Sequence, residues 1–345
     1  MLAKVINIEI CESCFNVCII YIIKSIMFQP FKGFYWILFI LLFPIAVFSQ
    51  ASKYHYIPPL SAAGGNAAKF EGQWMYLSTP SNAPVNYTIW PLPLNNATKI
   101  TGTIDKLSPT ETLVNNTDYY VIQSSGIHHG VFTQLFVSYE NAGTVTSTKG
   151  YYIEADAPIY VSIRYQVANQ ASGFVSKGEA ALGKSFRTGG FTNGSPSDDN
   201  YLNFASVMAV EAGTTTVTFS DINNNAGDGY ADMENIAEVY DGSGNIADIE
   251  ITLNQFETFV IATRAPERGN HPLTGTENPP TAAQGKPYPI TNRDALIGML
   301  IESDKNIAVI SGGANGSMTE TYNGRDQGVD QIVGLDKIGN EFIFI

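Results

Sequence analysis

The oxygen-bearing side chains between residues 221 and 232 come closest to a metal site in this sequence. Their oxygens recur at alternate positions, which suits a hard cation such as Ca²⁺. An EF-hand loop, however, carries Gly where Ala226 stands and Glu where Asp232 stands, and the sequence predicts no flanking helices. Asn, Asp and Gly are also turn formers, so we favour a solvated turn and keep a calcium site as the alternative. The candidate ligands are Asp221, Asn223, Asn225, Asp228 and Asp232.

A second concentration of polar side chains lies near the end of the chain. It consists of Arg325, Asp326, Asp330 and Gln331. Most side-chain hydrogen bonds in proteins are local and structural. We therefore expect an internal hydrogen-bond network that closes this part of the fold. The alternative is a role in a contact surface.

The chain shows no arrangement typical of catalysis. Its four histidines include the neighbours His128 and His129, which would point to opposite faces of a strand and so cannot readily ligate one metal. The sequence has no Gly-x-Ser-x-Gly nucleophile elbow and no Gly-rich phosphate loop before a helix. We predict no catalytic residues, no cofactor-binding residues and no metal site beyond the calcium candidate. An enzyme that acts on polysaccharides is the least favoured hypothesis.

The net charge of the chain limits its partners. The formal net charge is -13 at pH 7. A surface this acidic repels phosphate backbones and anionic lipid headgroups, so we predict no nucleic-acid partner. Extracellular proteins and glycans remain as the expected classes of ligand.

The N-terminus indicates export. Residues 34–48 form a 15-residue apolar run after Lys32 and before Ser49, which matches a secretory signal peptide cleaved after Ser49. Such a run is short for a membrane-spanning helix, which needs about 20 residues. A signal peptide that starts at Met27 has ordinary proportions, so we expect Met27 to be the true start. The alternative is a double hydrophobic membrane segment over residues 13–48.

The mature protein is expected to begin after residues 1–50, with residues 51–70 as a lead-in. The three cysteines Cys11, Cys14 and Cys18 all lie in the upstream extension. No disulfide is therefore expected in the mature chain. Its stability must come from the size of its core and from strand pairing.

An internal repeat organises the remaining chain. Residues 150–161 (GYYIEADAPIYV) align without a gap with residues 298–309 (GMLIESDKNIAV), which follow 148 positions later, and six of the twelve residues coincide. Residues 178–186 align with residues 334–342 in the same way. Because the pieces follow the same order in both halves, the pattern indicates a duplication.

The duplication predicts two tandem copies of one β-module, at residues 71–191 and 202–345. No segment of ten or more residues has convincing helical periodicity, and short alternating segments are separated by turn formers. We therefore predict an all-β fold. The second copy ends in mid-strand, so we expect a fragment that stops before a third unit.

Each repeated piece is expected to form a β-hairpin. Ile153, Ile159 and Val161 alternate with outward-facing residues, which gives each arm one buried face. Residues 154–158 and 302–306 are expected to form the turns. Four such hairpins would suit the blades of a β-propeller, and paired β-sandwiches are the alternative. The hairpins start near Tyr76, Tyr151, Met208 and Met299.

Several short motifs follow one another in the second half of the chain. They are residues 296–312 (LIGMLIESDKNIAVISG), 325–331 (RDQGVDQ) and 338–342 (IGNEF), and residues 153–161 and 182–186 fit the same pattern. Their order resembles the N-terminal domain of IgGFc-binding proteins, most closely the bacterial surface-exposed members, over roughly residues 73–345. The resemblance implies an extracellular β-rich binding module and carries over no catalytic residue. It does not imply that this chain binds antibody.

These observations predict a secreted or cell-surface module for adhesion or ligand binding. The best candidate binding loop is the Pro- and Gly-rich segment from Ala265 to Asn292, because function tends to lie on such insertions. A structural spacer of a larger surface protein is the alternative. Membrane contact is expected only through the signal peptide or a missing C-terminal region. Aromatic residues could stack on sugars, although strand aromatics are more often core; those considered are Trp74, Trp90, Tyr119 and Tyr151.

Overall fold

The protein is all-β, as the sequence predicts. The computed structural model describes residues 50–61, 69–105, 117–123, 128–129, 134–137, 141–167, 170–190, 203–222, 246–263, 295–316 and 326–338. The strands are β1 (Ser52–Ile57), β2 (Leu60–Ser61), β3 (Lys69–Ser78), β4 (Val85–Pro91), β5 (Ile100–Ile104), β6 (Thr117–Gln123), β7 (His128–His129), β8 (Phe136–Val137), β9 (Val145–Thr146), β10 (Tyr151–Val167), β11 (Gln170–Ser176), β12 (Gly183–Arg187), β13 (Asn203–Ala209), β14 (Thr215–Ser220), β15 (Ile249–Leu253), β16 (Thr258–Ala262), β17 (Leu300–Gly316) and β18 (Asp326–Ile332). Two 3₁₀ turns, η6 (Gly178–Ala181) and η8 (Leu335–Lys337), are the helical segments within the described ranges.

Every described residue belongs to the compact unit Ser49–Ile345. The predicted signal peptide, Met27, the three cysteines and the segment from Ala265 to Asn292 lie outside the described residues. No helix in the described part of the chain has the length and hydropathy that a membrane span requires.

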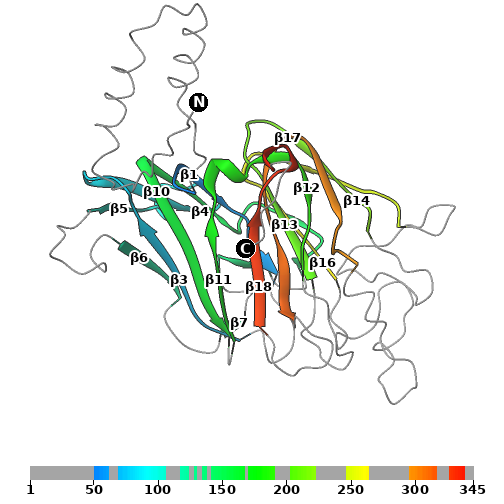
Figure 1. Cartoon of the computed structure of the whole chain (residues 1–345), viewed down its shortest axis with the longest axis horizontal. Coiled ribbons are helices and arrows are strands. Elements are labelled where there is room, and N and C mark those ends of the chain that lie inside the picture. The colour runs from blue at the N-terminus through cyan, green and yellow to red at the C-terminus, as the bar shows by residue number, and fades with distance from the viewer. Residues whose placement is uncertain are drawn as a thin grey trace, which may run out of the picture. The chain divides into compact units, whose positions relative to one another are not determined.

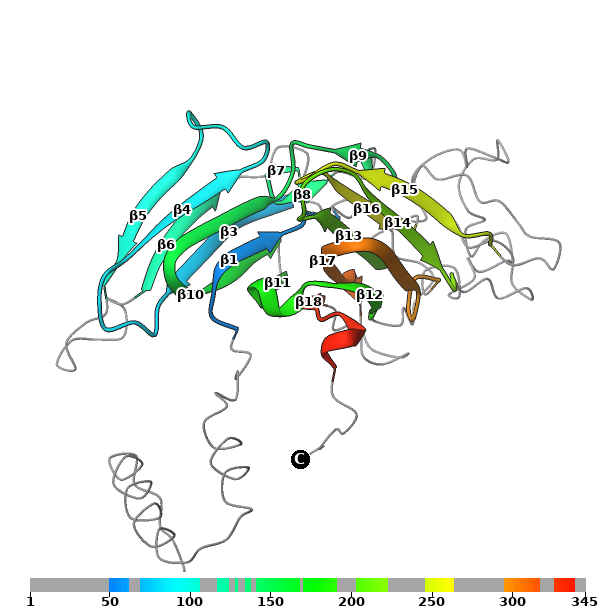
Figure 2. The same cartoon turned by 90° about the horizontal axis from the view of Figure 1, so that it is seen from above.

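The strands form two eight-stranded sheets, which Figures 1 and 2 show beside each other. The first sheet has the order β5-β4-β10-β3-β6, with β1 and β11 paired to β10 and β7 paired to β3. The second sheet has the order β15-β14-β17-β13-β16-β9, with β12 and β18 paired to β17. A small third sheet joins β2 and β8 in parallel.

Each large sheet is built on one 17-residue strand that changes partners along its length. The first part of β10 lies between β1 and β4, and its later part lies between β3 and β11. The long strand β17 does the same, first between β12 and β14 and then between β13 and β18. One strand therefore ties all parts of each sheet together.

The turns predicted at residues 154–158 and 302–306 are wrong, because both segments continue as strand. They lie where the long strand leaves one pair of partners for the next. The Asp156 carboxylate accepts the backbone N–H of Asn86 at 3.0 Å, and the Asp304 carboxylate accepts that of Thr216 at 2.9 Å. The acids thus bond to a neighbouring strand and not across a turn of their own.

The four strands proposed to begin propeller blades lie as two neighbouring pairs. The strand β3 contains Tyr76 and pairs with β10, which begins at Tyr151. The strand β13 contains Met208 and pairs with β17, which follows Met299. Each pair thus lies within one of the two large sheets.

The two large sheets share one plan of strands. Ile153 and Ile301, which are 148 residues apart, are both fully buried and both lie between an edge strand and an inner strand. Their edge-strand partners are His55 and Phe186, and their inner-strand partners are Ile89 and Phe219. The corresponding strands are β1 and β12, β3 and β13, β4 and β14, β5 and β15, β6 and β16, β10 and β17, and β11 and β18.

This plan moves the boundaries expected for the two copies. Residues 51–70, expected to be a lead-in, include β1, which is a full member of the first sheet. Residues 71–191, expected to be the first copy, include β12, which pairs with β17 in the second sheet. The sheets therefore divide before β12 and not after residue 191.

The apolar faces of the sheets form connected cores. Alternate residues of β10 point into the first core: Tyr151, Ile153, Ile159, Val161, Ile163 and Tyr165. The second sheet also contributes Phe204, Val260, Ala262 and Ile310 to that core, while their neighbours face the core of the second sheet. The strands β13 and β16 are therefore buried on both faces, and the second sheet packs against the first.

The glycines that precede the two long strands provide a matched test of this packing. Gly150 has a φ of 99° and Gly298 a φ of 82°, a region that favours glycine. A Cβ on Gly298 would meet nothing within 4 Å, whereas one on Gly150 would lie 2.6 Å from the carbonyl oxygen of Ile57. We expect Gly298→Ala to lower the free energy of unfolding by about 1–3 kcal/mol through backbone strain, and Gly150→Ala to lower it further. Urea unfolding of both variants measures this, and an equal or larger effect of Gly298→Ala contradicts it.

Candidate functional site

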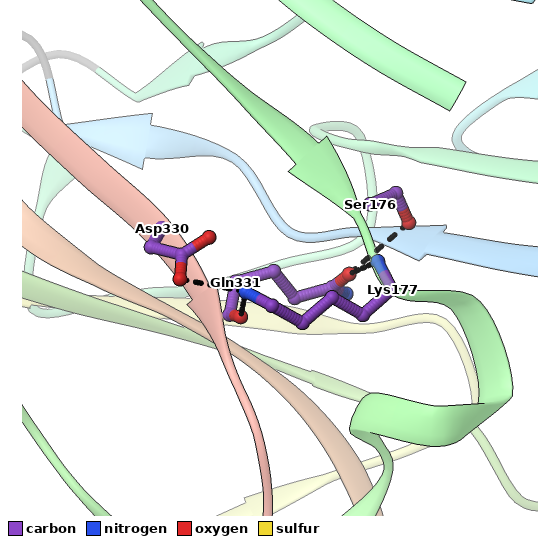
Figure 3. Close-up of polar contacts among 4 residues, drawn as sticks. All are labelled: Ser176, Lys177, Asp330 and Gln331. Carbon is purple, nitrogen blue, oxygen red and sulfur yellow. Dashed lines mark hydrogen bonds and ion pairs between the residues drawn. The ribbon is translucent and has the colours of Figure 1, made fainter. Parts of the chain in front are cut away.

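A polar junction joins the two sheets where β11 lies next to β18. It consists of Ser176, Lys177, Asp330 and Gln331 (Figure 3). The Gln331 side chain is 0% exposed. Its Oε1 accepts the Lys177 N–H at 2.6 Å and the Ser176 hydroxyl at 3.1 Å, and its Nε2 donates to the Tyr56 carbonyl oxygen at 2.8 Å. One amide therefore links β18 of the second sheet to β11 and β1 of the first.

An ion pair lies at the edge of this junction. The Lys177 ammonium is 2.6 Å from the Asp330 carboxylate and also donates to the Gln331 carbonyl oxygen. The Asp330 side chain is 60% exposed and that of Lys177 18%. Of the four residues that the sequence grouped here, Asp330 and Gln331 meet at the junction. Asp326 begins β18, and Arg325 lies outside the described residues.

His55 extends the polar junction into the first sheet. Its side chain is 0% exposed, and its Nδ1 lies 3.0 Å from the Ser176 hydroxyl. Its Nε2 lies 3.0 Å from the Ile159 carbonyl oxygen and 3.2 Å from that of Ser52. Burial lowers the pKa of His55 from 6.5 to about 4, against the opposing effect of these carbonyl groups. The imidazole is therefore neutral at pH 7, with its Nε2–H facing the two carbonyl oxygens.

Of the five proposed calcium ligands, Asp221 lies within the described residues. Asp221 has a φ of 54°, and its carboxylate lies 2.6 Å from the Arg187 guanidinium. The other four proposed ligands, residues 223, 225, 228 and 232, lie outside the described residues. Within the described ranges, no group of three or more His, Cys, Asp or Glu side chains could hold a metal ion.

The face of the first sheet opposite its core carries a row of aromatic side chains. His55, Ile89 and Ile153 are fully buried, so the residues next to them in each strand point to the opposite face. Tyr152 pairs with Tyr56 on one side and with Trp90 on the other, and Glu154 pairs with Tyr54. We call Tyr54, Tyr56, Trp90, Tyr152 and Glu154 the tyrosine face.

Close contacts hold the tyrosine face in place. The Tyr152 ring lies 5.3 Å from the Tyr56 ring, and 6.5 Å from the Tyr54 ring at an interplanar angle of 9°. The Glu154 carboxylate accepts the Trp90 indole N–H at 3.3 Å and the Tyr152 hydroxyl at 3.4 Å. Tyr54 is 38% exposed. The Tyr152 ring also lies 5.1 Å from the Phe256 ring, and Tyr56 and Tyr152 pack against a buried apolar cluster that includes Met208 and Ala308 of the second sheet. The face is therefore partly covered within the protein and is open at Tyr54.

The phenols of Tyr56 and Tyr152 remain protonated at neutral pH. Burial raises the pKa of Tyr152, and the nearby Tyr56 and Glu154 raise it further. Burial likewise raises the pKa of Tyr56 to about 12, with the Glu179 carboxylate as the next cause. The face therefore combines neutral rings with the negative charges of Glu154 and Glu179.

Strand pairing does not require these aromatic residues. The second sheet has the same positions, and at the place of Glu154 it has Glu302. At the places of Tyr54, Tyr56, Tyr152 and Trp90 it has Ser185, Arg187, Leu300 and Ser220. The aromatic row is therefore particular to the first sheet.

Of the rings on this face, Trp90 is predicted from the sequence, and Tyr54, Tyr56 and Tyr152 are not. Tyr151, which is also predicted from the sequence, is buried in the core. The alternation in residues 52–57 (SKYHYI) would have placed two tyrosines on one face, had the segment been recognised as a strand.

Replacement of Gln331 tests whether the junction holds the sheets together. We expect Gln331→Leu to lower the free energy of unfolding by about 2–4 kcal/mol, because the Lys177 N–H and the Tyr56 carbonyl would be buried without partners. The control Asp330→Asn removes an exposed ion pair and should cost less than about 1 kcal/mol. Urea denaturation measures both variants. Equal losses of stability in the two variants would show that the hydrogen bonds of Gln331 contribute no more than the exposed ion pair.

His55 predicts a loss of stability in acid. Between pH 6.5 and about 4 the unfolded chain binds a proton that the folded chain does not, so the free energy of unfolding falls as the pH falls through this range. The full loss, reached below pH 4, is about 3 kcal/mol. The equivalent position of the second sheet carries Phe186. The variant His55→Phe should therefore lack this pH-dependent change in the free energy of unfolding. Urea unfolding at several pH values measures it, and parallel pH profiles of the two proteins would contradict it.

Comparison with known proteins identifies one family. A family model described as IgGFc binding protein matches residues 172–345. The match covers most of β11 and all strands from β12 to β18, and is shorter than the resemblance over residues 73–345 expected from the motifs. No curated protein and no solved structure matches the chain.

Proposed function

The chain belongs to the IgGFc-binding protein family, and on this premise we propose that it is an extracellular, non-catalytic module that binds a protein or glycan ligand. The family is one of binding domains, and the apolar run of residues 34–48 supports export. Adhesion at a cell surface is the role that these features favour. No cofactor is part of the proposal.

The tyrosine face is the observation that carries a binding role. Tyr and Trp are enriched where proteins bind one another, because their rings bury much apolar area at little cost in side-chain entropy. Here Tyr54, Tyr152 and Trp90 stand on paired strands, so the rings are presented by a rigid support. Their counterparts in the second sheet are Ser185, Leu300 and Ser220. Tyr152 also packs against Phe256 within the protein, so Tyr54 is the ring of this face that the fold leaves most exposed.

A structural spacer is the alternative function, and it predicts no ligand at all. The polar junction supports this reading, since Gln331 uses its amide to join two sheets. An enzyme that acts on polysaccharides is the third hypothesis and has no described catalytic group in its favour. The three hypotheses differ in what the purified chain retains and in what it cleaves.

Binding by the full chain decides among these functions. The immobilised chain is exposed to the Fc fragment of IgG, to a mixture of secreted and surface proteins, and to a glycan array. We expect it to retain at least one protein or glycan. A chain that retains nothing is a spacer, and release of reducing ends from a polysaccharide would identify an enzyme.

A deletion locates the binding surface on the chain. Removal of residues 265–292 takes away the loop that the sequence favours and leaves the tyrosine face intact. We expect the deleted protein to fold and to keep its ligand. Loss of the ligand with an unchanged circular dichroism spectrum would assign binding to the loop instead.

A further inference from the structure

The tyrosine face combines aromatic rings with unpaired negative charge. Glu154 lies between Trp90 and Tyr152, and its two hydrogen bonds leave further acceptor positions on both carboxylate oxygens. Glu179 lies near enough to Tyr56 to raise the pKa of that phenol. Among the described residues, no Lys or Arg forms an ion pair with either carboxylate. Such a surface attracts a cation that can also contact an aromatic ring.

The chain itself places a cation on this face. The ammonium of Lys99 lies 5.1 Å from the centre of the Trp90 ring. This contact occupies one ring at one end of the face. The rings of Tyr54 and Tyr152 at the other end are nearly parallel, so a planar group that stacks on one lies parallel to the other. Tyr54 is also the direct cross-strand neighbour of Glu154, which brings a ring and a carboxylate together.

We propose that the tyrosine face binds an arginine side chain from a basic segment of an extracellular protein. The guanidinium stacks on the Tyr54 ring and donates hydrogen bonds to the Glu154 carboxylate. Its planar shape and weak hydration favour both contacts, and a lysine ammonium would satisfy them less well. The net charge of -13 draws basic segments toward the protein. This inference rests on the proposed binding function and names the chemistry of its ligand.

A neutral sugar is the competing occupant of an aromatic face. A sugar ring would stack on Tyr54 through its C–H groups and would donate hydrogen bonds to Glu154. Because it is neutral, it would gain no attraction from the negative charge of the carboxylates. The carboxylates beside the rings, with which no described Lys or Arg forms an ion pair, therefore favour a cation over a neutral ligand. The two occupants are separated by their response to salt, because attraction between charges is screened and ring stacking is not.

The test uses the full chain and a tetra-arginine peptide with blocked ends, followed by calorimetric titration. We expect Tyr54→Ala to raise the Kd about threefold to thirtyfold and Glu154→Gln to raise it by a similar factor. Tyr54→Phe keeps the ring and should bind as the parent does. Tetra-lysine should bind more weakly than tetra-arginine, and added salt should weaken both.

The second sheet supplies the control for non-specific attraction. Glu302→Gln removes one negative charge at the position equivalent to Glu154, where the cross-strand partners are Ser185 and Thr218. Its Kd should equal that of the parent. An equal loss in Glu302→Gln and Glu154→Gln overturns the proposal, because net charge would then explain binding.

Two further outcomes overturn the proposal while the binding function stands. In the first, cellotetraose binds and Tyr54→Ala abolishes that binding, while tetra-arginine does not bind. In the second, Tyr54→Ala and Glu154→Gln both retain the protein ligand that the intact chain captures. If the intact chain captures no protein or glycan, the proposed function itself fails. The titration with tetra-arginine then tests by itself whether the tyrosine face binds arginine.

Discussion

Each sheet of this protein depends on the pairing of one long strand with four others. The strand β10 joins β1 and β4 to β3 and β11, and β17 joins the corresponding four strands of the second sheet. Because alternate side chains of the long strand point inward along its whole length, it lines the core continuously where separate hairpins would leave breaks. The change of partners occurs at Asp156 and Asp304, whose carboxylates bond to the neighbouring strand.

Much of this architecture could be predicted from the sequence. The buried alternation around Ile153 and Ile159 follows directly from the period of a strand, and both are fully buried. The turn at residues 154–158 could not be excluded, because Asp and Pro favour a turn wherever the chain has no other partner for them. Here the partner is Asn86, some 70 residues away, and a local pattern contains no information on such a contact.

The candidate sites were predictable to different degrees for the same reason. Gln331 could be singled out because polar residues cluster around it in sequence, but its bond to the Tyr56 carbonyl spans 275 residues. The tyrosine face depends on the pairing of β1 with β10, and the segment that contains β1 was interpreted as a lead-in. A row of side chains across several strands becomes visible only when the register of those strands is known.

The two sheets share one plan of strands but differ in the side chains that it carries. Strand pairing uses backbone groups, so equivalent positions can carry different side chains without altering the sheet. His55 and Phe186 show this inside the core, where one position bonds to the polar junction and the other is apolar. Tyr152 and Leu300 show it on the opposite face. The strands β13 and β16 of the second sheet are buried on both faces, whereas the first sheet carries aromatic residues and the Glu154 carboxylate on the face opposite its core, where Tyr54 is exposed.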